Sequence, residues 1–117
     1  MKYFSIREFD SPDVEGSGSW MNEKTLELLD EARGVAGIPF VINSGYRTKN
    51  HNRKVGGVSN SAHLKGYAVD LECKNAGDAH KIVTAAFICG FNRVGISKSF
   101  IHLDNDPSKN KNKIWTY

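Results

Sequence analysis

Residues 59–70 read Ser-Asn-Ser-Ala-His-Leu-Lys-Gly-Tyr-Ala-Val-Asp, and residues 100–104 read Phe-Ile-His-Leu-Asp. The two stretches supply two histidines and a carboxylate, His63, Asp70 and His102. Any one of these side chains alone would be read as structural. Together they suit Zn²⁺, and three protein ligands leave a fourth position open, as in catalytic zinc sites. The spacing differs from the helical zinc signature, in which two histidines lie one turn apart. We therefore expect a loop that leads into a strand at Asp70, with His102 on a distant strand.

Alternation of apolar and polar residues predicts strands around this site. In the range 66–72, Asp70 falls on the face opposite the bulky apolar side chains. In the range 99–104, the same period of two places His102 and Asp104 on one face. Further strands are predicted at 38–43, 91–96 and 114–117.

Helical spacing of apolar residues marks two other segments. One runs over residues 21–36, and the second over 75–89, with Asn75 as its N-cap and Gly90 as its stop. The polar range 49–60 contains two adjacent glycines and is predicted to be a long loop. Two helices on an antiparallel sheet make an α+β fold, and the length predicts a single domain over residues 1–117.

The composition is that of an ordinary globular domain with a mild positive charge. Of 117 residues, 39% are hydrophobic and 25% are charged, and the formal net charge is +3. The apolar runs are too short to span a bilayer, so we expect no membrane insertion. Basic residues gather only at Lys109, Lys111 and Lys113, too few for a nucleic-acid footprint, so we expect no nucleic-acid partner. The range 1–10 lacks the apolar stretch of a signal peptide, so we expect synthesis in the cytoplasm. A monomer is the default for this size.

Four short motifs follow one another along the chain. They are Ser-Gly-Tyr-Arg at 44–47, Ser-Ala-His at 61–63, Gly-Tyr-Ala-Val-Asp at 66–70 and Phe-Ile-His-Leu-Asp at 100–104. The series resembles the M15 zinc peptidases, which include D-Ala-D-Ala carboxypeptidases and phage endolysins that cut the peptide stems of peptidoglycan. The resemblance implies a small antiparallel sheet flanked by helices, as in hedgehog and D-Ala-D-Ala peptidases. It also implies that His63, Asp70 and His102 hold Zn²⁺.

The resemblance further implies a substrate, the peptidoglycan stem peptide, and leaves the scissile bond open between D-Ala-D-Ala and L-Ala-D-Glu. We expect a phage or prophage endolysin that reaches the cell wall after release through a membrane lesion. Arg47 matches the family's substrate-clamping arginine, since its planar fork can bind a carboxylate bidentately. The alternative is that Arg47 pairs with an acid of the protein. Tyr46 and Ser61 are expected to contact the substrate, with core packing and loop hydrogen bonding as their respective alternatives.

The general base is not assigned by the resemblance. Many relatives place Glu or Asp three residues before the last zinc histidine, where this chain has Ser99. Asp104 is the first candidate because it lies two residues from His102 on the same strand face, and Glu72 is the second. Either carboxylate could instead hold a zinc histidine through its other ring nitrogen. The departure at Ser99 also leaves a second function open, a catalytically inactive zinc-containing module for cell-wall peptide binding or assembly.

Overall fold

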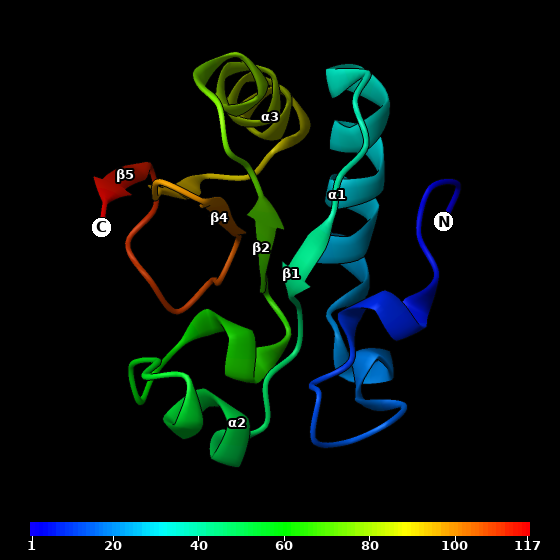
Figure 1. Ribbon diagram of the computed structural model, residues 1–117, viewed down its shortest axis with the longest axis vertical. Helices are drawn as coiled ribbons and strands as arrows, with labels where there is room; N and C mark the ends of the chain where they lie inside the picture. Colours follow the sequence, from blue (N-terminus) through cyan, green and yellow to red (C-terminus); the bar gives the residue numbers. More distant parts are fainter.

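The computed structural model describes residues 1–117 and has helices and strands in an α+β arrangement (Figure 1). The α-helices are α1 (Glu23–Ala36), α2 (Lys49–Lys54) and α3 (Ala76–Cys89). The strands are β1 (Ile42–Ser44), β2 (Ala68–Glu72), β3 (Arg93–Ile96), β4 (Phe100–Asp104) and β5 (Lys113–Thr116). Short 3-10 turns are η1 (Ile6–Phe9), η2 (Ser17–Trp20) and η3 (Ala62–Lys65). The predicted fold class is confirmed. None of the helices has the length and apolar character needed to cross a membrane.

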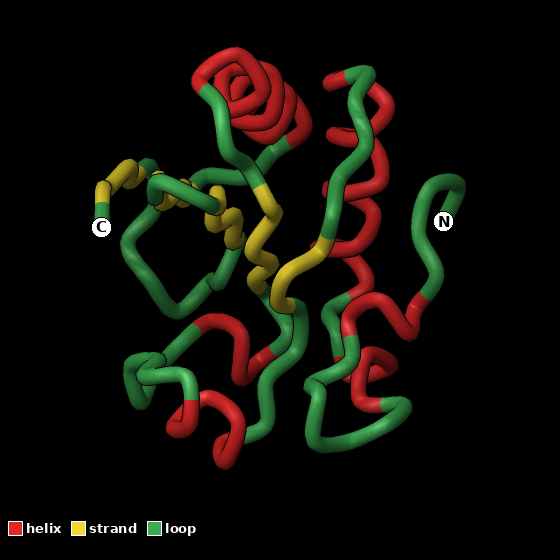
Figure 2. The backbone as a smooth tube through the Cα atoms, viewed as in Figure 1, coloured by secondary structure: helices red, strands yellow, loops and turns green.

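The strands, drawn in yellow in Figure 2, form one sheet. Their order in the sheet is β1-β2-β4-β3-β5. Three of its pairings are antiparallel, as predicted, but β5 runs parallel to β3 at one edge. Both Asp104, at the end of β4, and Lys113, at the start of β5, pair with Arg93. The loop of residues 105–112 therefore leaves and re-enters the sheet at the same end. Strand direction at this edge depends on that loop, so alternation within the strand could not predict it.

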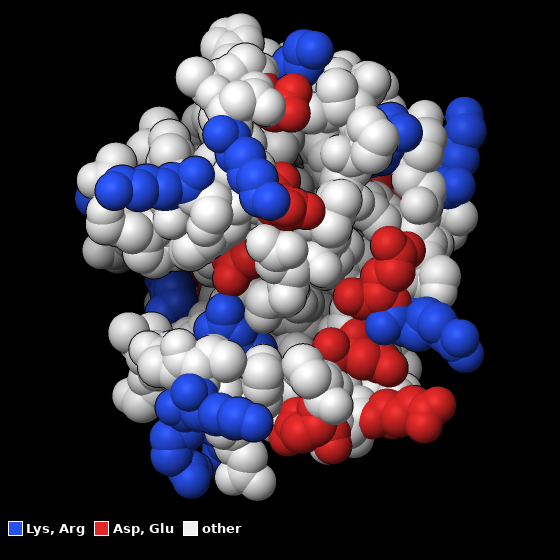
Figure 3. Space-filling model, viewed as in Figure 1, with Lys and Arg blue, Asp and Glu red and all other residues white.

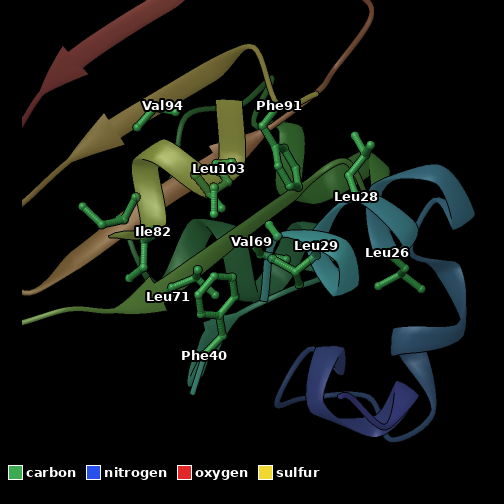
Figure 4. Close-up of a cluster of buried hydrophobic side chains, with 14 of the residues drawn as sticks. Leu26, Leu28, Leu29, Phe40, Val69, Leu71, Ile82, Phe91, Val94 and Leu103 are labelled. Atoms are coloured by element: carbon green, nitrogen blue, oxygen red, sulfur yellow. The ribbon is translucent and has the colours of Figure 1, made fainter. Parts of the chain in front are cut away.

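The core lies between the sheet and the helices α1 and α3. Leu29 of α1 and Ile82 of α3 meet Val69, Leu71 and Leu103 of the two central strands (Figure 4). Full burial of each such side chain contributes about 1.5–3 kcal/mol to stability. Because strand side chains alternate between faces, filling one face with these residues turns the intervening polar residues to the other.

Local sequence sets the ends of both long helices. The Asn22 side chain accepts a hydrogen bond from the Thr25 amide and caps α1, so the helix starts two residues later than the predicted 21. The Asn75 side chain accepts from the Asp78 amide and caps α3, as predicted. Gly90, with φ of 116°, ends α3 in the left-handed conformation that favours glycine.

Two predicted segments differ from the structure. The range 49–60 is not all loop, because Lys49–Lys54 forms α2. The Thr48 side chain accepts from the His51 amide and caps this short helix. The polar residues and the two glycines that follow favour a loop over this helix in the sequence. The strand predicted at 38–43 is instead the shorter segment Ile42–Ser44, which begins later and ends one residue later. Pro39, in the first part of the predicted range, has no amide hydrogen to donate to a ladder.

Candidate metal centre

His63 is positioned by the tight turn η3. The Ser61 side chain caps this turn by accepting a hydrogen bond from the His63 amide at 3.2 Å. Gly66 ends it with φ of 79°, and a Cβ atom there would lie 2.5 Å from the Trp20 carbonyl oxygen. Glycine is therefore required by both conformation and space. The result is a histidine that is only 2% exposed, just before β2 begins.

Asp70 and His102 are placed by strand pairing. Asp70 lies in the middle of β2, directly opposite His102 on β4. Side chains at directly opposed positions of antiparallel strands project to the same face with Cβ atoms about 4.5–5.5 Å apart. Val69, Leu71 and Leu103 fill the core face, so these two polar residues share the other face.

The three predicted ligands come together at a spacing that suits a small metal ion. One ligand atom from each of His63, Asp70 and His102 lies within 4.8 Å of the others. Asp70 Oδ1 is 3.2 Å from His63 Nε2 and 2.9 Å from His102 Nδ1. Donor atoms around a tetrahedral Zn²⁺ lie roughly 3.3 Å apart, given bond lengths near 2.0–2.2 Å. The donor set and the spacing therefore fit zinc.

The other polar atom of each ligand already has a partner in the protein. His63 Nδ1 donates to the Gly45 carbonyl oxygen at 2.8 Å, which leaves Nε2 toward the site. His102 Nε2 lies 2.7 Å from Asp104 Oδ2, which leaves Nδ1 toward the site. Arg47 donates to Asp70 Oδ2 at 3.0 Å, which leaves Oδ1. Such outer partners fix the tautomer and orientation of metal ligands and are a regular feature of zinc sites.

Gly45 can serve His63 because its backbone presses against the N-terminal segment. A Cβ atom at Gly45 would lie 2.7 Å from Phe9 Cα, and the Tyr46 amide donates to the Phe9 carbonyl at 2.9 Å. The glycine of the Ser-Gly-Tyr-Arg motif therefore allows a backbone approach that holds its carbonyl toward His63.

Burial and neighbouring charges shift the pKa values of all three ligands. Burial lowers the pKa of His63, although hydrogen bonding and charge from Asp70 oppose the shift. Burial alone would raise the pKa of Asp70, but hydrogen bonds with His102 and His63 outweigh it, so the pKa falls well below its usual range. Burial opposes protonation of His102, yet its pKa is raised because Asp104 and Asp70 flank the ring. Asp70 is thus a carboxylate, and a metal ion at His102 would compete with protons for the ring nitrogen.

Asp104, predicted as the general base, is held within the protein at both oxygens. Oδ2 contacts His102 Nε2, and Oδ1 accepts from Arg93 Nε at 2.9 Å and from the Asp106 amide at 3.2 Å. The side chain is buried, and residue exposure is 1%. This geometry favours the alternative considered for Asp104, that of holding a zinc histidine by its other nitrogen.

Glu72 and Ser99 both lie away from the site. Glu72 ends β2, is exposed, and pairs with Lys74 at 2.9 Å. Ser99 is exposed as well, and neither residue lines the cavity beside the candidate ligands. The residue at the position where many relatives carry a base therefore does not line the cavity in this chain.

A cavity of about 410 Å³ opens beside the candidate ligands. Its lining includes the three ligands, Arg47, Ser61 and Asp104 among the predicted site residues. Tyr46 does not line it; this side chain packs against the core and contacts the Trp20 ring edge-on at 5.5 Å. The Tyr46 side chain is therefore packed against the core, which was the alternative to substrate contact for this residue.

Four further residues form a cavity wall that sequence reasoning missed as functional. They are Phe100, Arg93, Trp115 and Tyr117. The Trp115 ring lies 5.4 Å from the His102 ring, and the Arg93 guanidinium lies 5.0 Å from the Trp115 ring. Gly95 makes room for this wall, since a Cβ atom there would lie 2.6 Å from Trp115 Nε1. The sequence signal for this wall was the pair of aromatic residues at 115 and 117. The direction of the strand that carries them could not be predicted from the sequence.

Comparison with known proteins agrees with this geometry. A family model described as Peptidase M15 matches residues 2–104, most of the chain. The matched range contains every candidate metal ligand and the residues that hold them. No curated protein sequence matches the chain significantly.

Proposed function

Because the chain belongs to the M15 peptidase family, we propose that it is a zinc-dependent metallopeptidase that hydrolyses the stem peptides of peptidoglycan. The observation that carries the proposal is the convergence of His63 Nε2, Asp70 Oδ1 and His102 Nδ1 at the edge of a cavity. Each of these atoms faces the site because its partner atom is engaged elsewhere. We further propose a phage or prophage endolysin acting on the cell wall, which rests on the resemblance of the motifs.

The chain's own residues would prepare the site for hydrolysis. Bound Zn²⁺ would polarise the scissile carbonyl and lower the pKa of a water molecule toward 7. Gly45 and Asp104 orient the two histidines, and Arg47 orients Asp70. Trp115 and Phe100 form an apolar wall that excludes water from one side of the ligands.

A second candidate function has a specific observation in its favour. Only two carboxylates line the cavity, Asp70 and Asp104, and both are fully engaged with protein partners. Proton transfer from a water molecule to the leaving amine needs a free acceptor within hydrogen-bond reach. A zinc-containing module that binds cell-wall peptides without turnover is therefore the alternative to the peptidase.

The experiment that separates the two is digestion of purified peptidoglycan by the zinc-loaded protein, with and without a chelator. Released fragments are identified by mass spectrometry, and His63→Ala serves as the matched control. Chelator-sensitive release of D-Ala indicates a D-Ala-D-Ala carboxypeptidase, whereas new D-Glu N-termini indicate an L-Ala-D-Glu endopeptidase. Binding of stem peptide by folded, zinc-loaded protein without any fragment supports the binding module.

A further inference from the structure

Three cationic side chains line the cavity, and they differ in how many of their donor groups already have partners in the protein. They are Arg47, Arg93 and Lys109, and they face the two carboxylates Asp70 and Asp104. Figure 3 shows several Lys and Arg side chains along the left of the view, the side of β5 and α2 in Figure 1, and others at the right edge, while most Asp and Glu side chains lie at lower right. A cationic side chain without a protein partner can bind an anionic group of a ligand, so the protein partners of each cation determine whether it is available to a ligand.

Arg47 has a protein partner on every nitrogen of its guanidinium group. Nε donates to Ser44 Oγ at 2.9 Å, one terminal nitrogen to Asn52 Oδ1 at 3.1 Å, and the other to Asp70 Oδ2 at 3.0 Å. Bidentate capture of a carboxylate requires two neighbouring N–H groups on one edge of the fork. The contact at Nε interrupts one such edge, while each terminal nitrogen keeps a second N–H group. Arg47 therefore already orients a candidate metal ligand, and a clamp at this residue would have only the remaining terminal N–H groups to offer a substrate.

Arg93 is only partly used. Its Nε donates to Asp104 Oδ1 at 2.9 Å, and one terminal nitrogen donates to the Asn110 carbonyl at 2.7 Å. The second terminal nitrogen has no protein partner. Stacking on the Trp115 ring holds the guanidinium group in place at the cavity wall. One directed donor is therefore available to a ligand.

Lys109 has neither an ion pair nor a side-chain hydrogen bond, although it is half-buried and lines the cavity. The loop on both sides of it is anchored. Ser108 is held by Asp106 Oδ1, which accepts from its amide at 2.9 Å and its hydroxyl at 2.7 Å, and by Lys65 Nζ at 2.8 Å. Asn110 is held by Arg93. The backbone on both sides of Lys109 is therefore held beside the cavity. Less loop ordering is then needed when a ligand binds, which reduces the entropy lost on binding.

We propose that Lys109 and the free terminal nitrogen of Arg93 form a carboxylate-binding subsite that selects anionic peptide substrates. The inference rests on the proposed function for the peptide class. The ligand chemistry is a peptide carboxylate near the scissile bond, supplied either by the α-carboxylate of D-Glu or by the C-terminal D-Ala. Both cavity carboxylates are neutralised within the protein, so a substrate carboxylate is the group that completes the charge pairing.

The test measures binding, so that it does not depend on turnover. The probe is the synthetic stem pentapeptide L-Ala-γ-D-Glu-L-Lys-D-Ala-D-Ala, titrated calorimetrically into metal-free and zinc-loaded protein. Lys109→Gln should weaken binding about tenfold or more, as expected for loss of a hydrogen bond between charged groups. Lys111→Gln removes the same charge from an exposed position of the same loop outside the cavity, and should change binding by less than about twofold.

Two amidated peptides identify the carboxylate. One carries an amide at the D-Glu α-position and the other at the C-terminus. The peptide that lacks the recognised carboxylate should bind wild type and Lys109→Gln equally. Equal weakening by Lys109→Gln and Lys111→Gln, no weakening by either, or no binding of the peptide to wild type would overturn the subsite. Selective weakening by Lys109→Gln without any hydrolysis would leave the subsite standing and the peptidase proposal refuted.

Discussion

Replacing Asp104 by Asn should lower zinc affinity about 10–100-fold, the range typical of lost outer partners of metal ligands. The carboxylate accepts on both sides, from His102 at 2.7 Å and from Arg93 and the Asp106 amide through the other oxygen. An amide has one accepting atom and one donating group. If its oxygen stays with Arg93, its NH₂ group faces His102 Nε2 and requires that nitrogen to accept. The ring proton then moves to Nδ1, the atom needed for the metal.

The reverse orientation of the introduced amide is unfavourable as well. An oxygen turned toward His102 would place the NH₂ group against the Arg93 and Asp106 donors, in a site where the residue is 1% exposed. Each unsatisfied buried donor costs about 1–3 kcal/mol. We therefore expect the variant to lose stability as well as zinc affinity, and the raised pKa of His102 to fall because its nearest carboxylate is gone.

Zinc affinity is measured by competition with a chromophoric chelator, and the His102 pKa by NMR titration of the metal-free protein. Glu72→Gln is the matched control, because it removes a carboxylate that is exposed and outside the cavity. It should leave zinc affinity unchanged. If Asp104→Asn kept wild-type zinc affinity but lost turnover by 100-fold or more, the orienting role would be wrong and Asp104 would be the proton acceptor in catalysis.

Three further predictions concern the same centre. His102→Ala, which removes a ligand outright, should abolish tight zinc binding by equilibrium dialysis, and retained stoichiometric zinc would exclude this residue as a ligand. Gly45→Ala should destabilise the fold by about 1–3 kcal/mol in denaturant unfolding, since a Cβ atom would lie 2.7 Å from Phe9 Cα; Gly77→Ala, whose nearest contact is 3.4 Å, is the control that should not destabilise. Zinc affinity should rise with pH by about tenfold per unit until the raised pKa of His102 is passed, because binding displaces its proton. A pH-independent zinc affinity from acidic to neutral pH would contradict that titration.

The sequence contains enough information to predict which face of its strand Asp70 or His102 occupies, because that property depends on a local rule. Period-two alternation places Asp70 and His102 on the polar face of their strands, and the core then faces the other way. Caps have the same local character, which is why the N-cap at Asn75 and the stop at Gly90 are found where predicted. Strand faces and caps need no knowledge of how distant segments meet, whereas the convergence of the candidate ligands depends on the pairing of β2 with β4.

The cavity walls could not be predicted by the same means. Arg93 and Trp115 meet because β5 runs parallel to β3, an arrangement set by the loop of residues 105–112. Tyr46 follows Gly45 in a motif that points to the site, yet its ring packs against Trp20. The motif contributes the Arg47 side chain and the Gly45 backbone carbonyl to the site, and side-chain types cannot signal the role of the carbonyl.

The charged residues of the cavity bear differently on peptide binding and on peptide hydrolysis. The lining has three cations and two carboxylates, and both carboxylates are engaged by protein donors. A bound divalent ion would add further positive charge, so a ligand carboxylate would be stabilised whether or not hydrolysis follows. If the proposed subsite binds an anionic peptide, selection would depend on Lys109 and Arg93, whereas hydrolysis would need a proton acceptor that no free cavity carboxylate supplies. The proposed peptide binding and the proposed peptide cleavage would then rest on different groups, so each proposal needs its own measurement.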